Sequence, residues 1–89
     1  MSRSLRKTAR FLTQVQEIHP SVPYLLESIA GAEWVLVRDP ERGMAVRGSR
    51  MRSWPIHPNE AVSFKITYFF DEREVVMEGL YPVVSPSAR

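Results

Sequence analysis

The sequence predicts an α+β fold in which a helical hairpin packs on a small, twisted antiparallel sheet. Apolar residues recur with a helical period up to Pro40 and with a strand period of two after it. A short proline-containing link separates the two helical stretches, which is typical of a helical hairpin. The strongest alternation, over residues 62–70, is followed by a tight turn and a second apolar run, as in an antiparallel strand pair.

The first helix is expected over residues 8–18. Thr8 is suited to cap its N-terminus, because a threonine hydroxyl accepts hydrogen bonds from the free N–H groups of the first turn. The apolar residues of this segment share one helical face: Phe11, Leu12, Val15 and Ile18. The helix should end at His19, because a residue that precedes a proline avoids the helical conformation.

The second helix is expected over residues 22–38, between a cap at Ser21 and the stop at Pro40. Its apolar residues are Tyr24, Leu25, Ile29, Ala32, Val35 and Leu36. Trp34 lies on or near this face, so we expect it in the core. Gly31 weakens the helix by up to about 1 kcal/mol relative to alanine, and we expect it to allow close packing against the first helix.

The sheet is expected to have three or four antiparallel strands. Residues 44–47 and 51–56 form short strands, the central strand spans 62–70, and the returning strand spans 75–80. Residues 1–7 form either a flexible tail or an edge strand. We expect the central residues Phe64, Ile66 and Tyr68 to be buried against the helices. Their expected helical partners are Leu12, Val15, Leu25, Ile29 and Leu36.

Composition places the chain among single-domain globular proteins, with one domain over residues 1–89 and a net charge of +2. The chain has no cysteine, which excludes disulfide scaffolds, zinc–thiolate sites, iron–sulfur clusters and thiol nucleophiles. No apolar run approaches the roughly 20 residues that span a membrane. No apolar segment follows the basic N-terminus, so we expect no signal peptide and a cytoplasmic protein.

Charge is arranged in blocks along the chain. Residues 1–10 and 38–52 are basic, whereas 11–37 and 53–89 are acidic. If the fold brings the two basic blocks together, they form a surface that binds a polyanion. A solvated basic tail and a solvated basic loop explain the same pattern equally well.

The order of elements resembles the RelE/ParE superfamily of toxins from bacterial type II toxin–antitoxin systems, over about residues 8–81. The resemblance rests on four segments after the start of the helical pair: Arg38-Asp39-Pro40-Glu41-Arg42-Gly43, the strand with Arg52 and Trp54, Ser63-Phe64-Lys65-Ile66-Thr67-Tyr68-Phe69, and Val75-Val76-Met77-Glu78-Gly79-Leu80. It implies a toxin from a system of the plasmid-stabilising kind, neutralised by a cognate antitoxin protein.

The resemblance implies one of two activities. RelE-like members inhibit translation by cleaving mRNA on the ribosome, as endoribonucleases that need neither metal nor cofactor. They use basic residues on the sheet, with an arginine and often a tyrosine at or after the last strand. ParE-like members inhibit DNA gyrase instead. After Leu80 this chain has no arginine before Arg89. A ParE-like role or a non-catalytic protein-interaction role therefore stays open. Whether the chain forms a homodimer is also open.

Two cations are the candidate catalytic residues, Arg52 and Lys65. Lys65 alternates with the apolar residues of the central strand, so it should point to the open face of the sheet, and we expect Arg52 to meet it there. Two cations on one face would bind a phosphate and stabilise its charge during cleavage. Alternatively, they only solvate the open face. The candidate nucleic-acid-binding residues are Arg47, Arg50, Trp54 and His57. Trp54 could instead belong to the core.

Overall fold

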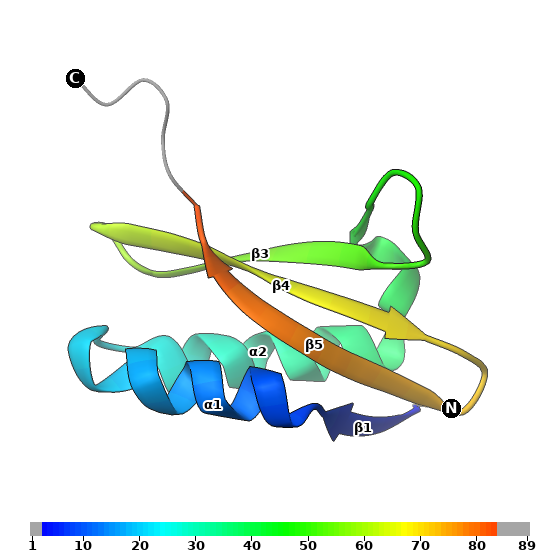
Figure 1. Cartoon of the computed structure of the whole chain (residues 1–89), viewed down its shortest axis with the longest axis horizontal. Helices are drawn as coiled ribbons and strands as arrows, with labels where there is room; N and C mark the ends of the chain where they lie inside the picture. Colours follow the sequence, from blue (N-terminus) through cyan, green and yellow to red (C-terminus); the bar gives the residue numbers. More distant parts are fainter. Residues whose placement is uncertain (1–2, 84–89) are drawn as a thin grey trace.

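The computed structural model describes residues 3–83, and it has two helices on one face of a five-stranded mixed sheet (Figure 1). This confirms the predicted α+β class. The strands follow the order β1-β5-β4-β3-β2. The elements are β1 (Ser4–Lys7), α1 (Ala9–Ile18), α2 (Leu25–Arg38), β2 (Met44–Ala45), β3 (Arg52–Asn59), β4 (Val62–Phe70) and β5 (Glu74–Pro82), with 3-10 turns at His19–Ser21 and Pro40–Arg42. Within the described range, neither helix is long and apolar enough to cross a membrane.

The helices begin where local chemistry allows it. Thr8 caps α1 as expected, because its hydroxyl oxygen accepts the Phe11 N–H at 3.1 Å. In contrast, α2 begins at Leu25, three residues later than predicted at 22. Tyr24, just before it, has a left-handed backbone with φ 68°. The start at 22 was wrong because Val22 precedes a proline and is held extended.

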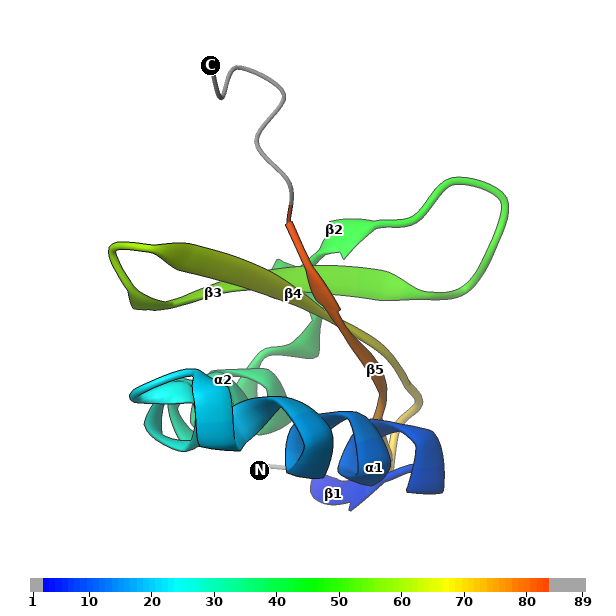
Figure 2. The ribbon, with the colours of Figure 1, turned by 60° about the vertical axis from the view of Figure 1, so that its left-hand side comes forward.

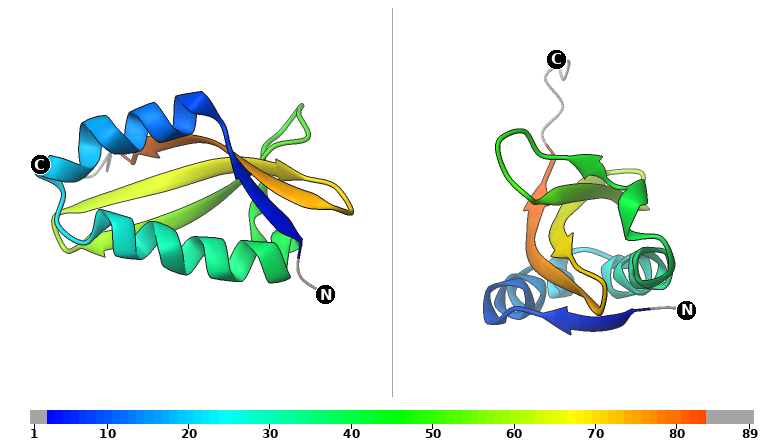
Figure 3. Two further views of the ribbon diagram at one scale, coloured as in Figure 1. Left: turned by 90° about the horizontal axis from the view of Figure 1, so that it is seen from below. Right: turned by 90° about the vertical axis from the view of Figure 1, so that its right-hand side faces the viewer.

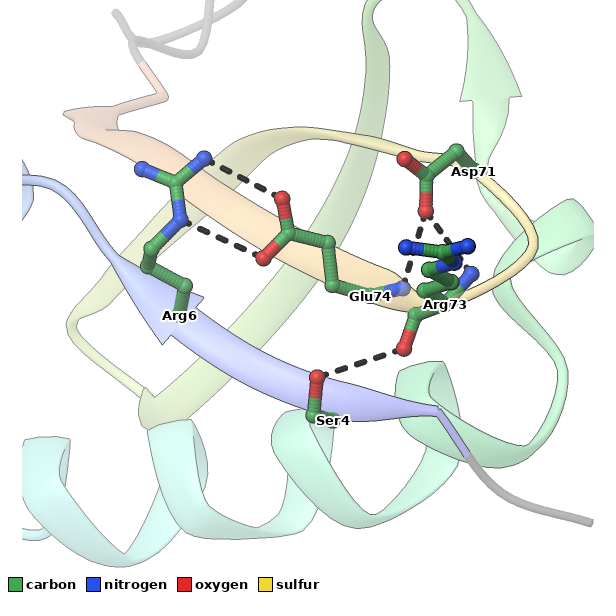
Figure 4. Close-up of polar contacts among 5 residues, drawn as sticks. All are labelled: Ser4, Arg6, Asp71, Arg73 and Glu74. Atoms are coloured by element: carbon green, nitrogen blue, oxygen red, sulfur yellow. Dashed lines mark hydrogen bonds and ion pairs between the residues drawn. The ribbon is translucent and has the colours of Figure 1, made fainter.

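β1 makes the sheet mixed, which corrects the expectation of a purely antiparallel sheet of three or four strands. The segment 4–7 is an edge strand that lies parallel to β5 (Figure 3). Its side chains explain the pairing. Leu5 packs against the core, and Arg6 forms an ion pair of 3.2 Å with Glu74 (Figure 4). Lys7 forms a second ion pair, of 2.8 Å with Glu33 of α2, so contacts with distant segments hold this short strand.

A single core fills the space between the helices and the sheet. The predicted burial of Phe64, Ile66 and Tyr68 is confirmed, with exposed fractions of 3%, 0% and 0%. The helical contributors are Phe11, Leu25, Ile29, Ala32 and Leu36. Val15 packs at the edge of the core.

Three expectations about the helices are wrong. Leu12 is exposed rather than buried, and Trp34 lies outside the core with 61% of its surface exposed. Trp34 is two residues from both Ala32 and Leu36, and two residues turn a helix by about 200°, so its side chain points away from them. Gly31 is not a contact point with α1, because a Cβ at this position would meet no atom within 4 Å.

Candidate nucleic-acid interface on the open sheet face

The helices cover one face of the sheet and leave the other open (Figure 2). Lys65 lies on the open face of β4, the middle strand of the sheet. Lys65 lies across from Pro55 of β3 and Tyr81 of β5 in the strand register. Because directly opposed residues point to the same face, these three side chains share the open face. Lys65 is exposed, as predicted.

Arg52 does not join Lys65, and this corrects the predicted two-cation site. Arg52 is opposite Tyr68, whose side chain is buried on the helix-covered face, so Arg52 lies on that face. Its guanidinium donates to the carbonyl oxygens of Gly43 at 2.8 Å and Glu41 at 3.3 Å. Arg52 therefore fixes a turn and is not available to a phosphate on the open face.

The sequence contained a signal for this. Ile56 alternates in step with Arg52, and Ile56 is 5% exposed in the core. Residues i and i+4 of a strand point to the same face, so an apolar Ile56 predicts a covered Arg52. The prediction that Arg52 lies on the open face is therefore wrong, because its position relative to Ile56, and not its charge, decides its face.

Tyr68, on the covered face of β4, holds the same turn at residues 40–43. Its hydroxyl donates to the Pro40 carbonyl oxygen at 2.6 Å and accepts the Gly43 N–H at 3.0 Å. Burial raises the pKa of Tyr68, and the hydrogen bond from Gly43 opposes that rise. Gly43 is packed so closely that an added Cβ would lie only 2.8 Å from the Ser53 carbonyl oxygen. The turn that carries Arg42 is thus rigidly positioned.

A shallow hollow of about 410 Å³ lies between that turn and Lys65. Its lining residues are Arg42, Gly43, Met44, Ser53, Trp54, Pro55, Lys65 and Val83. The Arg42 guanidinium lies 5.9 Å from the centre of the Trp54 ring. Trp54 is half-buried and packs against the core, which favours the core interpretation, although it also forms part of the hollow. The hollow therefore combines two cations with an apolar wall.

His57 lies further along the same face. It is exposed, and its Nδ1 atom lies 2.8 Å from Ser63 Oγ on β4. Ser63 is two residues from Lys65, so the His57–Ser63 pair and Lys65 lie in adjacent positions of one face. The hydroxyl fixes the orientation of the ring, and an imidazole is a common general acid or base.

Arginines cover the two open-face aromatics. The Arg50 guanidinium lies 4.1 Å from the centre of the Phe69 ring, and Arg10 lies 5.6 Å from that of Tyr81. The Tyr81 ring also lies over Gly79, since an added Cβ at that position would meet it at 2.7 Å. Sequence reasoning missed Arg10 and Tyr81 as site residues. Alternation on the last strand is a signal for Tyr81, whereas Arg10 comes from α1 and has none.

Arg47 and Arg50 belong to the β2–β3 loop, which projects beyond the end of the sheet (Figure 2). Arg50 returns to the open face through Phe69, as described above. Arg47 is exposed and is not part of the hollow. The structure thus brings Arg50, His57 and Lys65 to the open face and leaves Arg47 at the loop. It places Arg52 and Trp54 on the covered face, since Trp54 is opposite the buried Ile66.

Among residues 3–83, no group of three or more potential ligand side chains could hold a metal ion. The only arginine after Leu80 is Arg89, which lies outside the described residues. The chain matches no protein-family model and no curated protein sequence. Function is therefore inferred from the open face and from the sequence pattern.

Proposed function

We propose that the chain is a RelE/ParE-type toxin whose open sheet face binds and cleaves mRNA without a metal or cofactor. The observation that carries this proposal is the position of Lys65, exposed at the centre of the open face and in register with Tyr81. RelE-like toxins place a basic residue on the sheet and often a tyrosine at or after the last strand. Lys65 and Tyr81 match that description.

The proposed chemistry is the attack of a ribose 2′-oxygen on the adjacent phosphorus. The 2′-hydroxyl loses its proton, the new P–O bond forms, and the bond to the 5′-oxygen breaks as that oxygen gains a proton. Lys65 stabilises the negative charge that develops on the phosphoryl oxygens. His57, held by Ser63, and Tyr81 are the groups on this face that can transfer protons.

Binding of RNA is supported by the cations and aromatic rings around Lys65. Arg42 and Arg50 can contact phosphates, which position the strand without reading its sequence. Bases of a single strand stack on aromatic side chains, and Phe69 is the half-buried open-face ring beside Arg50. On this proposal Arg52 has only a structural role.

A cognate antitoxin protein is the proposed partner, and the open face is where it would block the RNA. The hollow beside Lys65 has an apolar wall formed by Met44, Trp54 and Pro55, which suits a protein side chain. A toxin that acts on translating ribosomes works in the cytoplasm, and we place the protein there as part of the same proposal.

An alternative function is binding of a protein target, either DNA gyrase in the ParE manner or another partner. Two observations favour it. The predicted partner cation Arg52 is held behind the sheet, and Met44 at the hollow is 75% exposed. An apolar, exposed rim is more typical of a protein interface than of a ribonuclease site.

Induced expression in bacteria tests the proposal. The wild-type chain should arrest growth and produce new mRNA ends in primer extension, and Lys65→Ala should lose both. Arg73→Ala, an exposed cation in the β4–β5 turn, serves as the matched control and should stay toxic. Toxicity that persists in Lys65→Ala without mRNA cleavage would favour the gyrase-type function. A wild-type chain that is not toxic would leave only the interaction role.

A further inference from the structure

The outward side of α2 carries an apolar strip that the fold does not use. Leu26 is 50% exposed and Trp34 is 61% exposed. They lie four residues to either side of Ala30, so all three fall on neighbouring positions of the helix surface. We call the set Leu26, Glu27, Ala30, Gly31, Trp34 and Arg38 the outer α2 face.

Neither Gly31 nor Trp34 is required by the packing of the described chain. Gly31 is exposed, and a Cβ there would meet nothing within 4 Å, although glycine inside a helix costs about 1 kcal/mol relative to alanine. The guanidinium of Arg38 stacks on Trp34 and lies 4.1 Å from its ring centre. A small residue and a large exposed ring on one face are what a second helix needs for close approach.

The two ends of the outer α2 face carry opposite charges, so the face is complementary to an antiparallel copy of itself. Glu27 lies toward the N-terminal end of α2 and Arg38 at its C-terminal end. Among residues 3–83, neither side chain is in an ion pair, whereas Arg6, Lys7 and Arg10 are. An antiparallel copy of the same helix would place each Glu27 toward the Arg38–Trp34 pair of the other copy.

We propose that the outer α2 face binds a second copy of this chain, with the two α2 helices crossing antiparallel at Ala30 and Gly31. The two-fold axis makes the interface isologous, so each Leu26 meets the Trp34 of the other chain. Ala30 and Gly31 at the crossing let the helix axes approach to about 8 Å. The helices of different chains thereby bury the apolar strip that α1 and the sheet leave open.

A recess beside Leu26 supports this register. A hollow of about 280 Å³ lies between α1 and α2, and Leu12, Leu26 and Ala30 form part of its lining. In the antiparallel pair the Trp34 ring of the second copy lies over Leu26, at the mouth of this hollow. Leu12, 46% exposed, then packs against that ring.

A second copy fits this face better than an unrelated partner does. A uniformly acidic or basic partner would match one end of the face and be repelled at the other, whereas an antiparallel copy matches both ends. One helix pair buries less than the roughly 1,200 Å² of a stable complex, so the dimer should dissociate in the micromolar range. This inference is independent of Lys65 and of the proposed ribonuclease function.

Sedimentation equilibrium of the full chain over micromolar concentrations measures the dimer directly. Trp34→Ala should weaken it by more than about tenfold. Met44→Ala removes an even more exposed apolar side chain, 75% against 61% for Trp34, from the opposite side of the sheet and should leave the dissociation constant unchanged. Circular dichroism of both variants checks that they remain folded. A chain that stays monomeric up to about 1 mM, or a dimer that Trp34→Ala leaves intact, overturns the proposal.

Charge exchange tests the antiparallel register. Glu27→Arg and Arg38→Glu should each weaken the dimer, and the double variant should restore it, because every cross-chain pair is again opposite in charge. A double variant no tighter than the single ones overturns the antiparallel register.

The absence of native cysteine allows a second test. Ala30→Cys should form a disulfide-linked dimer on mild oxidation, since only residues near the two-fold axis come within the Cα separation of about 4.4–6.8 Å that a disulfide needs. The control Gln16→Cys, exposed on α1, should remain a monomer. Equal cross-linking of both variants would contradict the proposed interface.

Discussion

The two faces of β4 differ completely although they alternate along one strand. Phe64, Ile66 and Tyr68 point to the helices and are almost fully buried, whereas Lys65 between them is exposed. The covered face is closed by side chains from both helices, and its substitutions should change stability. The open face holds its cations over aromatic rings and beside a hollow, and its substitutions should change binding. Alternate residues of β4 therefore serve stability and the proposed function.

Arg52 and Lys65 extend this comparison to two cations. The sequence predicts that both side chains bind a phosphate. The register between β3 and β4 puts Arg52 on the covered face, where it holds the carbonyl groups of Glu41 and Gly43. The charge of a residue thus indicates what it can bind, but the face on which it lies decides what it does bind.

The largest expected effect is on the covered face. Ile66→Ala should lower the free energy of unfolding by about 2–5 kcal/mol, because it removes buried contacts and leaves a cavity. Its neighbour Lys65→Ala should change that free energy by less than about 0.5 kcal/mol. Urea denaturation of both variants measures the difference. Similar losses in the two variants would mean that the faces of β4 are not distinct in stability.

A smaller loss is expected when only the hydroxyl of Tyr68 is removed. Tyr68→Phe leaves the Pro40 carbonyl and the Gly43 N–H without their buried partner, at a cost of about 1–3 kcal/mol. Tyr81→Phe on the open face is the matched control and should be nearly neutral in the same denaturation experiment. If Tyr68→Phe were neutral as well, the turn at Pro40–Arg42 would be held by other contacts.

Arg52→Ala should separate stability from function. We expect a loss of about 1 kcal/mol in the free energy of unfolding, because the hydrogen bonds of Arg52 are partly exposed. Toxicity in cells should persist at temperatures where the variant is folded, whereas Lys65→Ala should lose it. A folded but non-toxic Arg52→Ala variant would return Arg52 to the catalytic site.

The smallest expected change in stability concerns Asp71, in the turn that joins β4 and β5. Asp71 accepts the N–H groups of Arg73 at 2.8 Å and Glu74 at 2.9 Å (Figure 4), and these bonds lower the pKa of its carboxyl group below the ordinary value of 3.8. A lowered pKa contributes stability above pH 3.8, and this contribution is lost as the pH falls through the folded pKa.

Asp71→Asn keeps an oxygen atom that accepts hydrogen bonds, but its amide group does not ionise. The stability advantage of the wild-type chain over Asp71→Asn should therefore be present at neutral pH and shrink below about pH 4. Thermal unfolding from neutral to acidic pH measures this difference. An advantage that stays constant down to low pH would show that the Asp71 charge does not contribute to the turn.

The sequence by itself determined the helical hairpin, the main strand pair and the covered face of β4, since these follow from local period. Phe64, Ile66 and Tyr68 repeat every second residue, so any fold that buries one of them buries all three. The same rule applied to Ile56 places Arg52 behind the sheet. The same rule of helical period places Trp34 away from Leu36. The predictions of Arg52 on the open face and of Trp34 in the core are wrong because position in the strand or helix, and not residue type, decides which way a side chain points.

Only the tertiary structure decided the pairings between distant segments. β1 is polar and short, and contacts with distant segments hold it beside β5: the packing of Leu5 and the ion pairs of Arg6 with Glu74 and of Lys7 with Glu33. Likewise, the β2–β3 loop brings Arg50 to Phe69, and strand register places Lys65 opposite Tyr81. Register is set by the sum of many weak cross-strand contacts and not by any one segment, so it cannot be derived from local period.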